Sequence, residues 1–141
     1  MQLPTDEARS RLAAARVARL ATVGETGQPH LVPVTFALDL ARDVDRVFIA
    51  VDHKPKTTRN LKRLRNIEAN PRVCLLADDY AEGWTQLWWV RADGTAAILR
   101  EPADLADPLR LLAAKYPQYQ ANTPAGPVIS IHLTSYTAWH A

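Results

Sequence analysis

The sequence predicts a mainly β protein of the α+β class, in which an antiparallel sheet of about six strands closes or splits into a small barrel with a few flanking helices. Short apolar or alternating runs dominate the chain, and turn residues separate several of them. Only a few segments have helical periodicity. Short antiparallel strands favour a barrel because closure protects the edges of the sheet. Tryptophans gathered near the middle of the chain indicate that neither face of that region is simply exposed to water.

The first half of the chain is predicted to hold one helix and three strands. Thr5 is the expected N-cap, with Asp6 and Glu7 in the first turn, and the helix ends near Arg16. A strand, a turn, a return strand and a third strand then follow at residues 17–23, 24–27, 28–38 and 45–51. Because Pro33 has no backbone N–H, the return strand should lie at a sheet edge or contain a bulge.

The second half begins with a helix that ends near Asn70, since the residue before a proline disfavours helical backbone. Two further strands are joined by a turn at Asp93 and Gly94, and a second helix and a last strand complete the chain. The expected ranges are strands 72–77, 84–92 and 95–100, helix 102–115, and strand 128–133 or further to 139.

Alternation along residues 84–92 places Trp84 and Trp88 on one face and Trp89 on the other. One face is expected to be the barrel interior, and the other a ligand site or a subunit contact.

A length of 141 residues suits one domain with a single core, and we expect residues 1–141 to form it. The first residues are not followed by the apolar run of a signal peptide, and no segment has the roughly 18–20 apolar residues of a membrane span. Cys74 is the only cysteine, so an internal disulfide and a cysteine-built metal site are excluded. The expectation is a cytoplasmic protein without a metal centre or a membrane partner.

The strongest functional signal is a basic segment, residues 54–65, which holds six of the seventeen Lys and Arg. Eleven basic residues then remain against fifteen acidic ones, so the rest of the chain has a net charge of −4. The segment follows an apolar strand and leads into a helix whose apolar side is Leu61, Leu64 and Ile67. Such a junction is suited to an anion such as phosphate. A solvated helix face is the alternative interpretation, because Lys and Arg are common on exposed helices.

Four blocks of sequence occur in a set order: 18–23 with 27–34, the basic segment, 70–76, and 88–96. In this order they resemble the split-barrel flavin and deazaflavin oxidoreductases, the relatives of pyridoxamine-phosphate oxidase. The resemblance covers nearly the whole chain and is greatest to the actinobacterial branch that uses coenzyme F420, a deazaflavin with a phospholactyl-polyglutamate tail. It implies a six-stranded antiparallel split β-barrel of the FMN-binding type.

The resemblance also implies a cofactor site made of two regions. In the family, the strand after the first turn lays its backbone along the cofactor ring, and the matching residues are Val32, Pro33 and Val34. The basic loop and the next helix bind the cofactor phosphate, and the matching residues are Lys54, Lys56, Thr57, Thr58, Arg63, Arg65 and Asn66. The loop is longer than in some relatives, so Lys56 and Arg63 are alternatives for the principal phosphate ligand. The family site lies between two subunits, which implies a homodimer in which Trp88 or Trp89 faces the partner, and Trp88 is included among the cofactor-binding residues.

No catalytic side chain is assigned. The chain contains no Gly-rich P-loop, no Gly-x-Ser-x-Gly and no His-Glu-x-x-His motif. Its four histidines stand at separate points and are interpreted as structural or surface residues: His30, His53, His132 and His140. Hydride transfer by a cofactor needs little from side chains beyond positioning.

Three functions remain open. The first is an oxidoreductase that uses coenzyme F420, or alternatively FMN, to transfer a hydride to a small unsaturated or aromatic substrate. Coenzyme F420 is preferred because six cations exceed what one phosphate requires and can also meet trailing carboxylates. The second is a non-catalytic flavin or F420 binder. The third is a nucleic-acid-binding barrel, which is disfavoured because the rest of the chain is net acidic.

Overall fold

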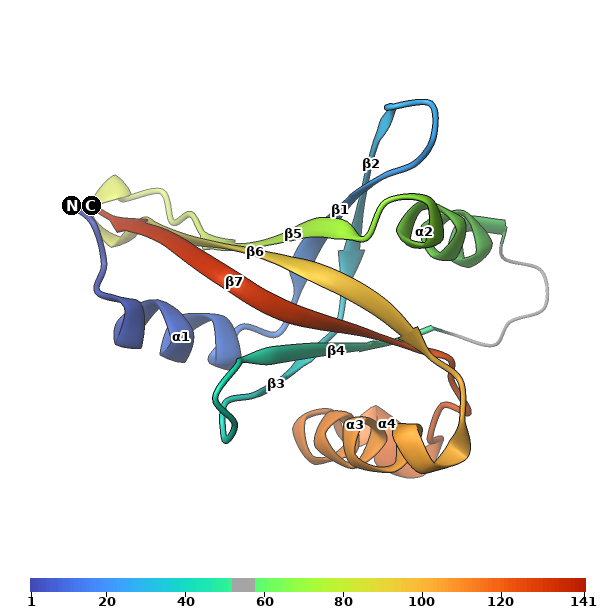
Figure 1. Ribbon diagram of the computed structural model, residues 1–141. Helices are drawn as coiled ribbons and strands as arrows, with labels where there is room; N and C mark the ends of the chain where they lie inside the picture. The colour runs from blue at the N-terminus through green and yellow to red at the C-terminus, as the bar shows by residue number, and fades with distance from the viewer. Residues whose placement is uncertain (52–57) are drawn as a thin grey trace.

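The computed structural model describes residues 1–51 and 58–141 as one seven-stranded antiparallel sheet with helices packed around it (Figure 1). The elements are α1 Thr5–Ala14, β1 Ala18–Val23, β2 Pro29–Val34, β3 Ala37–Asp39, β4 Arg46–Ala50, α2 Thr58–Ala69, β5 Arg72–Asp79, η1 Trp84–Gln86, β6 Trp88–Leu99, α3 Pro102–Lys115, α4 Pro117–Ala121 and β7 Val128–His140. The hydrogen-bonded order of the strands is β2-β1-β5-β6-β7-β4-β3. The predicted mainly β fold is confirmed, but this sheet has seven strands and runs from β2 to β3 without closing.

The additional strand arises because the predicted strand 28–38 is divided in two. β2 pairs with β1, whereas β3 pairs with β4 in the other half of the sheet. Between them, the N–H of Phe36 donates to the hydroxyl oxygen of Tyr116 at 3.0 Å. A side chain therefore replaces a strand neighbour at this link, and the chain can leave one half of the sheet for the other. β2 is an edge strand, which is where Pro33 was expected to lie.

β6 is one continuous strand of 12 residues, and the turn predicted at Asp93 and Gly94 was wrong. The register with β7 shifts between these two residues, which is a β-bulge. A Cβ on Gly94 would lie 2.5 Å from the carbonyl oxygen of His132 and 2.7 Å from Cγ2 of Ile131. The glycine is therefore required by the close approach of β7, and β6 and β7 together form a long twisted ribbon through the molecule (Figure 1).

The helix α1 begins at Thr5, one residue earlier than predicted, so Thr5 is its first residue and not its cap. Pro4 occupies the N-cap position, and no side chain makes a capping hydrogen bond there. The helix is held instead by Arg9, whose Nε and Nη2 donate to the carboxylate of Asp45 at 2.7 and 2.9 Å. The hydroxyl of Tyr136 on β7 donates to the same carboxylate at 2.7 Å. This group of three residues joins α1, the start of β4, and β7.

The helices α2 and α3 lie where the periodicity predicted them, whereas the short helix α4 was not predicted. α2 ends just before Asn70 and packs on β1 and β6, and α3 packs on β3 and β4. The interior is filled by aliphatic and aromatic side chains in two adjoining clusters, the larger around Leu20, Leu75 and Ile131. Of the helices in the described ranges, none is both long and apolar enough to cross a membrane.

The tryptophans differ from their prediction in one respect. Trp84 lies in the short 3-10 helix η1 and is 77% exposed, so it does not share a strand face with Trp88. Trp88 and Trp89 are on opposite faces of β6, as alternation predicted. Trp88 packs against the larger core cluster, and Trp89 lines a cavity on the outer side of the sheet.

Candidate functional site

The strand β2 presents two faces and one unpaired edge. His30, Val32 and Val34 form an inward row that is half-buried or buried, whereas Leu31 and Pro33 are exposed on the other side. Within the described sheet, β1 is the only neighbour of β2, so the other edge of β2 offers backbone N–H and C=O groups. This arrangement is suited to a flat ring laid along the backbone of residues 32–34.

The helix α2 is anchored to the β1–β2 hairpin through Asn66. This residue is 8% exposed, and its Nδ2 donates to Oγ1 of the buried Thr22 at 3.1 Å. Gly24, at the hairpin turn, leaves the necessary room, because a Cβ there would collide with the Asn66 side chain. Asn66 therefore fixes the helix against the β1–β2 hairpin, and its predicted contact with the cofactor stays a prediction.

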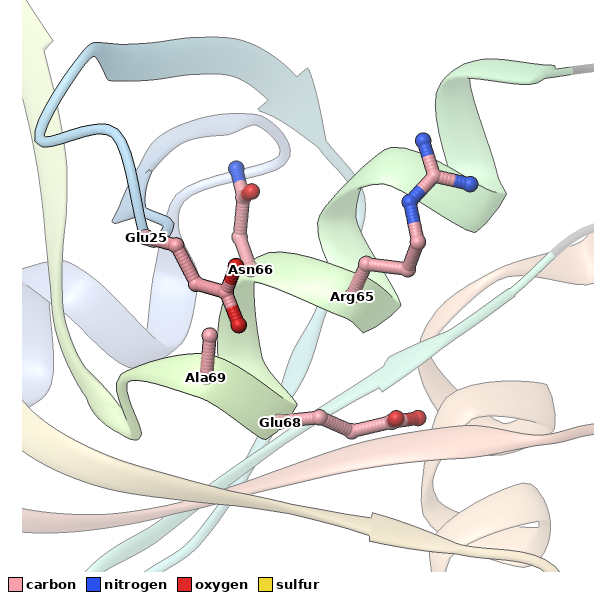
Figure 2. Close-up of a pocket in the computed structure, with 5 residues that line it drawn as sticks. All are labelled: Glu25, Arg65, Asn66, Glu68 and Ala69. Carbon is pink, nitrogen blue, oxygen red and sulfur yellow. The ribbon is translucent and has the colours of Figure 1, made fainter.

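The two predicted arginines of α2 lie on different sides of the helix. Arg63 is three residues before Asn66 and so lies on the side that meets the hairpin. Arg65 is two residues further than Arg63, which is about 200° around the helix axis. It lines a cavity of about 420 Å³ with Glu25, Asn66, Glu68 and Ala69. Figure 2 shows Arg65 and Glu68 pointing away from Asn66 and Glu25. Because Arg63 and Arg65 project from different sides of the helix, they cannot serve one small anion equally.

The charges on the hairpin side of α2 act on His30. Burial lowers the pKa of the His30 imidazole, and the positive charges of Lys62 and Arg63 lower it further. Burial also lowers the pKa of the Arg63 guanidinium. The Nδ1 atom of His30 is buried and has no hydrogen-bond partner among the residues that the structure describes. An exposed lysine beside a half-buried arginine and a half-buried imidazole is a donor set that fits a phosphate group.

The remaining predicted residues fall in three places. Lys54, Lys56 and Thr57 lie outside the described residues, and Thr58 is the first residue of α2. Trp88 is not brought to the others within one chain. The centroid of its ring lies 5.3 Å from the guanidinium carbon of Arg11 on α1. Residues 32, 20, 75 and 92 pair with one another across β2, β1, β5 and β6, and Trp88 lies four residues along β6 from Ala92. Trp88 is therefore three strands away from Val32 and about 13 Å further along the strand direction.

His30 was not among the predicted site residues. The signal that identifies it is the period-2 alternation of β2, which places residue 30 on the same face as residues 32 and 34. In the described ranges, no group of three or more His, Cys, Asp or Glu side chains is arranged to hold a metal ion.

A mainly antiparallel sheet flanked by several helices agrees with the FMN-binding-like split-barrel class that the sequence predicts. Residues 4–140 match the family described as pyridoxamine 5'-phosphate oxidase, and the chain belongs to this family.

Among characterised proteins, a 5a,11a-dehydrotetracycline/5a,11a-dehydrooxytetracycline reductase from Streptomyces rimosus is 36% identical over 61 residues. That match covers 43% of this chain and only 39% of the reductase. An FAD-binding protein from Mesorhizobium loti superposes with a TM-score of 0.74 at 21% identity, over 98% of this chain and 95% of the other. The heme storage protein HutZ from Vibrio cholerae has a TM-score of 0.70 at 15% identity, over 99% and 95%. At these identities the structural matches define the fold.

Proposed function

We propose that this protein is an oxidoreductase that binds the deazaflavin coenzyme F420 and reduces a small unsaturated or aromatic substrate. The observation that supports this most is the position of the basic side of α2 next to His30, which lies on the inward row of the edge strand β2. A cofactor that carries both a flat ring and a phosphate needs a strand backbone to hold the ring and, next to it, cations to hold the phosphate. The family of the chain and the match to a reductase of a polycyclic substrate support the reaction class.

In this proposal each region of the chain has one task. The backbone of residues 32–34 orients the ring, and Lys62 and Arg63 bind the phosphate by charge-assisted hydrogen bonds. Asn66 keeps α2 at a fixed distance from the hairpin through Thr22. When bound, the cofactor supplies the hydride, so the chain has to position the substrate and exclude water rather than provide an acid–base pair.

FMN is the alternative cofactor, and the structural likeness to an FAD-binding protein is the observation that favours it. A ring and a phosphate would use the same two surfaces. The six cations of residues 54–65 favour coenzyme F420, whose tail adds carboxylates to the phosphate charge. A non-catalytic flavin or F420 binder would have the same pocket and would differ only in showing no turnover.

Competitive titration with coenzyme F420 and FMN tests the cofactor assignment. We expect F420 to bind more tightly, and Arg63→Ala to weaken binding about tenfold, which corresponds to the loss of a charge-assisted bond of about 1.5 kcal/mol. Arg110→Ala on α3 is the matched control, because Arg110 is exposed and far along the chain from the site. Equal or tighter binding of FMN would contradict the choice of F420, and unchanged binding in Arg63→Ala would contradict the phosphate site.

We also propose that two copies of the chain associate through the outer face of the sheet. This face contains a cavity of about 410 Å³ whose lining includes Ala21, Leu31, Cys74, Leu76, Tyr80 and Trp89. Leu31 is 65% exposed and Tyr80 is 64% exposed, which is unusual for large apolar side chains gathered on one face.

The charges on this outer face favour a second copy as the occupant. Nη1 of Arg19 lies 3.4 Å from Oδ1 of Asp78, and Nε of Arg91 lies 3.6 Å from Oδ1 of Asp93. Positive and negative charges are therefore both present on this face. A twofold interface brings each patch against itself, and such a patch must carry both signs to be complementary. Pro33 and Leu31 of β2 belong to the same face, which would place the ring-binding strand at the subunit boundary.

A further inference from the structure

His30 has the features of a ligand-binding residue rather than of a core histidine. Its side chain is half-buried on the inward row of β2, and its Nδ1 atom is buried without a hydrogen-bond partner in the described parts of the chain. A buried polar atom left without a partner costs free energy, and such atoms are rare in folded proteins. A bound group that supplies the missing hydrogen bond would remove this cost.

The elements around His30 bring two cations to it. His30 pairs across the sheet with Thr22 of β1, and Thr22 accepts the hydrogen bond from Asn66 of α2. Lys62 and Arg63 are four and three residues before Asn66, so they lie on the same side of the helix, one turn earlier. This explains why the charges of these two residues act on the imidazole.

No acidic group is among the causes that shift the pKa of His30 in the described structure. Glu25 at the hairpin turn and Glu68 of α2 line the cavity that contains Arg65, and Glu68 also lies 3.6 Å from Arg100. Thr22, which faces His30 from β1, carries no charge. Among the described residues, the charges that shift the pKa of His30 are those of Lys62 and Arg63, and both are positive.

We propose that His30, Lys62 and Arg63 form one anion subsite, which binds the phosphate group of the cofactor and takes up a proton on His30 as it does so. The identification of the anion rests on the proposed function, whereas the subsite itself rests on the three side chains. The phosphate would accept hydrogen bonds from the two cations and from the imidazolium, and the buried Nδ1 would gain its partner.

The direction of the pH dependence follows from electrostatics. Without an anion, burial and the two cations hold the pKa of His30 below its ordinary 6.5, so the imidazole is neutral at pH 7. A bound anion opposes the two cations and stabilises the imidazolium, so the pKa of His30 rises in the complex. The anion therefore binds more tightly at low pH, and its affinity falls as the pH rises through the pKa of His30 in the complex.

Inorganic sulfate is a suitable probe, because its own charge is constant over the pH range concerned. We expect the affinity of the protein for sulfate to fall about tenfold between about pH 5.5 and about pH 8, the effect of a shift of about one pKa unit. The ring proton resonances of His30 in the NMR spectrum should give a higher pKa with saturating sulfate than without it. A sulfate affinity that does not change with pH, or an unchanged His30 pKa, would overturn the proposal.

His30→Gln provides the matched variant, with His132→Gln on β7 as the control, since His132 is exposed and pairs with Thr95 on the other side of the sheet. We expect His30→Gln to bind sulfate with the weak affinity of the parent at high pH and without pH dependence, while His132→Gln follows the parent. Retained pH dependence in His30→Gln would contradict the role of His30. Parallel titrations with coenzyme F420 separate the two proposals: pH-linked sulfate binding without F420 binding refutes only the cofactor, and F420 binding with pH-independent sulfate binding refutes only the subsite.

Discussion

At the residue scale, Tyr136 makes a hydrogen bond whose strength depends on the charge of its acceptor. Its hydroxyl donates to Asp45, which also accepts both hydrogen bonds from Arg9. The bond from Arg9 lowers the pKa of Asp45 below the ordinary 3.8, burial opposes this shift, and the bond from Tyr136 adds to the lowering. Because the folded-state pKa is below the unfolded one, the stabilisation is complete above about pH 4 and is lost as the pH falls through the folded-state value.

Tyr136→Phe should therefore reduce the free energy of unfolding by about 1–2 kcal/mol at pH 7, which is the usual value for a hydrogen bond to a charged group reduced because the position is partly exposed. The difference from the parent should shrink as Asp45 becomes protonated. Urea unfolding at neutral and acidic pH measures it, and Tyr80→Phe is the control because Tyr80 is exposed. A cost that stays constant as the pH falls would show that ring packing, and not the carboxylate, accounts for it.

Lys115 is a second residue with a pH-dependent contribution. Its Nζ atom lies 3.9 Å from the centroid of the Phe36 ring. Burial, followed by the nearby charge of Arg16, lowers the pKa of Lys115 from 10.5 to about 8. The folded protein then binds fewer protons than the unfolded chain between these two values, so Lys115 makes the free energy of unfolding rise with pH in that range.

Lys115→Met keeps the length of the apolar stem and removes the titrating group. We expect the parent to gain stability relative to this variant between about pH 8 and about pH 10, since the contributions of other groups are common to both proteins and cancel. Unfolding curves at several pH values give this difference directly. A difference that does not change over the range would mean that the amine of Lys115 titrates normally in the folded protein.

At the scale of the element, the bulge in β6 depends on Gly94. Gly94→Ala should reduce the free energy of unfolding by about 2–3 kcal/mol, because the added methyl group would press on the backbone of His132 and the side chain of Ile131. Gly83→Ala is the control, because the nearest atom to a Cβ there is Oγ1 of Thr85, at 3.8 Å. Denaturant unfolding of both variants decides the matter, and similar small costs would mean that β7 yields easily at the bulge.

This bulge also shows where sequence patterns are sufficient and where they are not. The helix 102–115 and the helix ending near Asn70 follow from local periodicity and proline positions, and the structure agrees with both. An Asp-Gly pair within an apolar run is the same local signal for a hairpin turn and for a bulge. What distinguishes them is the approach of β7, which is about forty residues further along the chain.

Long-range contacts explain the other differences in the same way. The break between β2 and β3 depends on a hydrogen bond from the N–H of Phe36 to the hydroxyl of Tyr116, which is 80 residues away. No sequence pattern near residue 36 predicts this break. In the candidate site, composition identified the basic helix, whereas the helical repeat separates Arg63 from Arg65. The position of His30 beside that helix depends on the contact between Asn66 and Thr22, which only the folded chain reveals.

At the scale of the whole molecule, the proposed dimer can be tested with one substitution on its outer face. Leu76 is 37% exposed beside the cavity with Trp89. Leu76→Asp would place two carboxylates in an apolar self-contact, so we expect a dimeric parent and a monomeric variant by light scattering at micromolar concentration. Cofactor affinity should fall together with the dimer, because the cleft is proposed to lie at the boundary.

Val44→Asp makes a similar change at an exposed residue that borders the cavity near Arg9 and Tyr136, away from the outer face, and should leave the parent dimer intact. A monomeric parent that binds its cofactor normally would contradict the proposed interface.

The position of β7 in the sheet has a consequence for folding during synthesis on the ribosome. Among the described strands β7 comes last in sequence order, yet within this sheet it lies between β6 and β4 and connects the four strands β2, β1, β5 and β6 to the pair β4 and β3. While residues 128–140 are still unsynthesised, β6 and β4 each present an uncovered edge with nothing to bridge them. Such edges can pair with other nascent chains and so promote aggregation. Until β7 has been synthesised and has paired with β6 and β4, chaperones or rapid completion of the sheet must protect these edges.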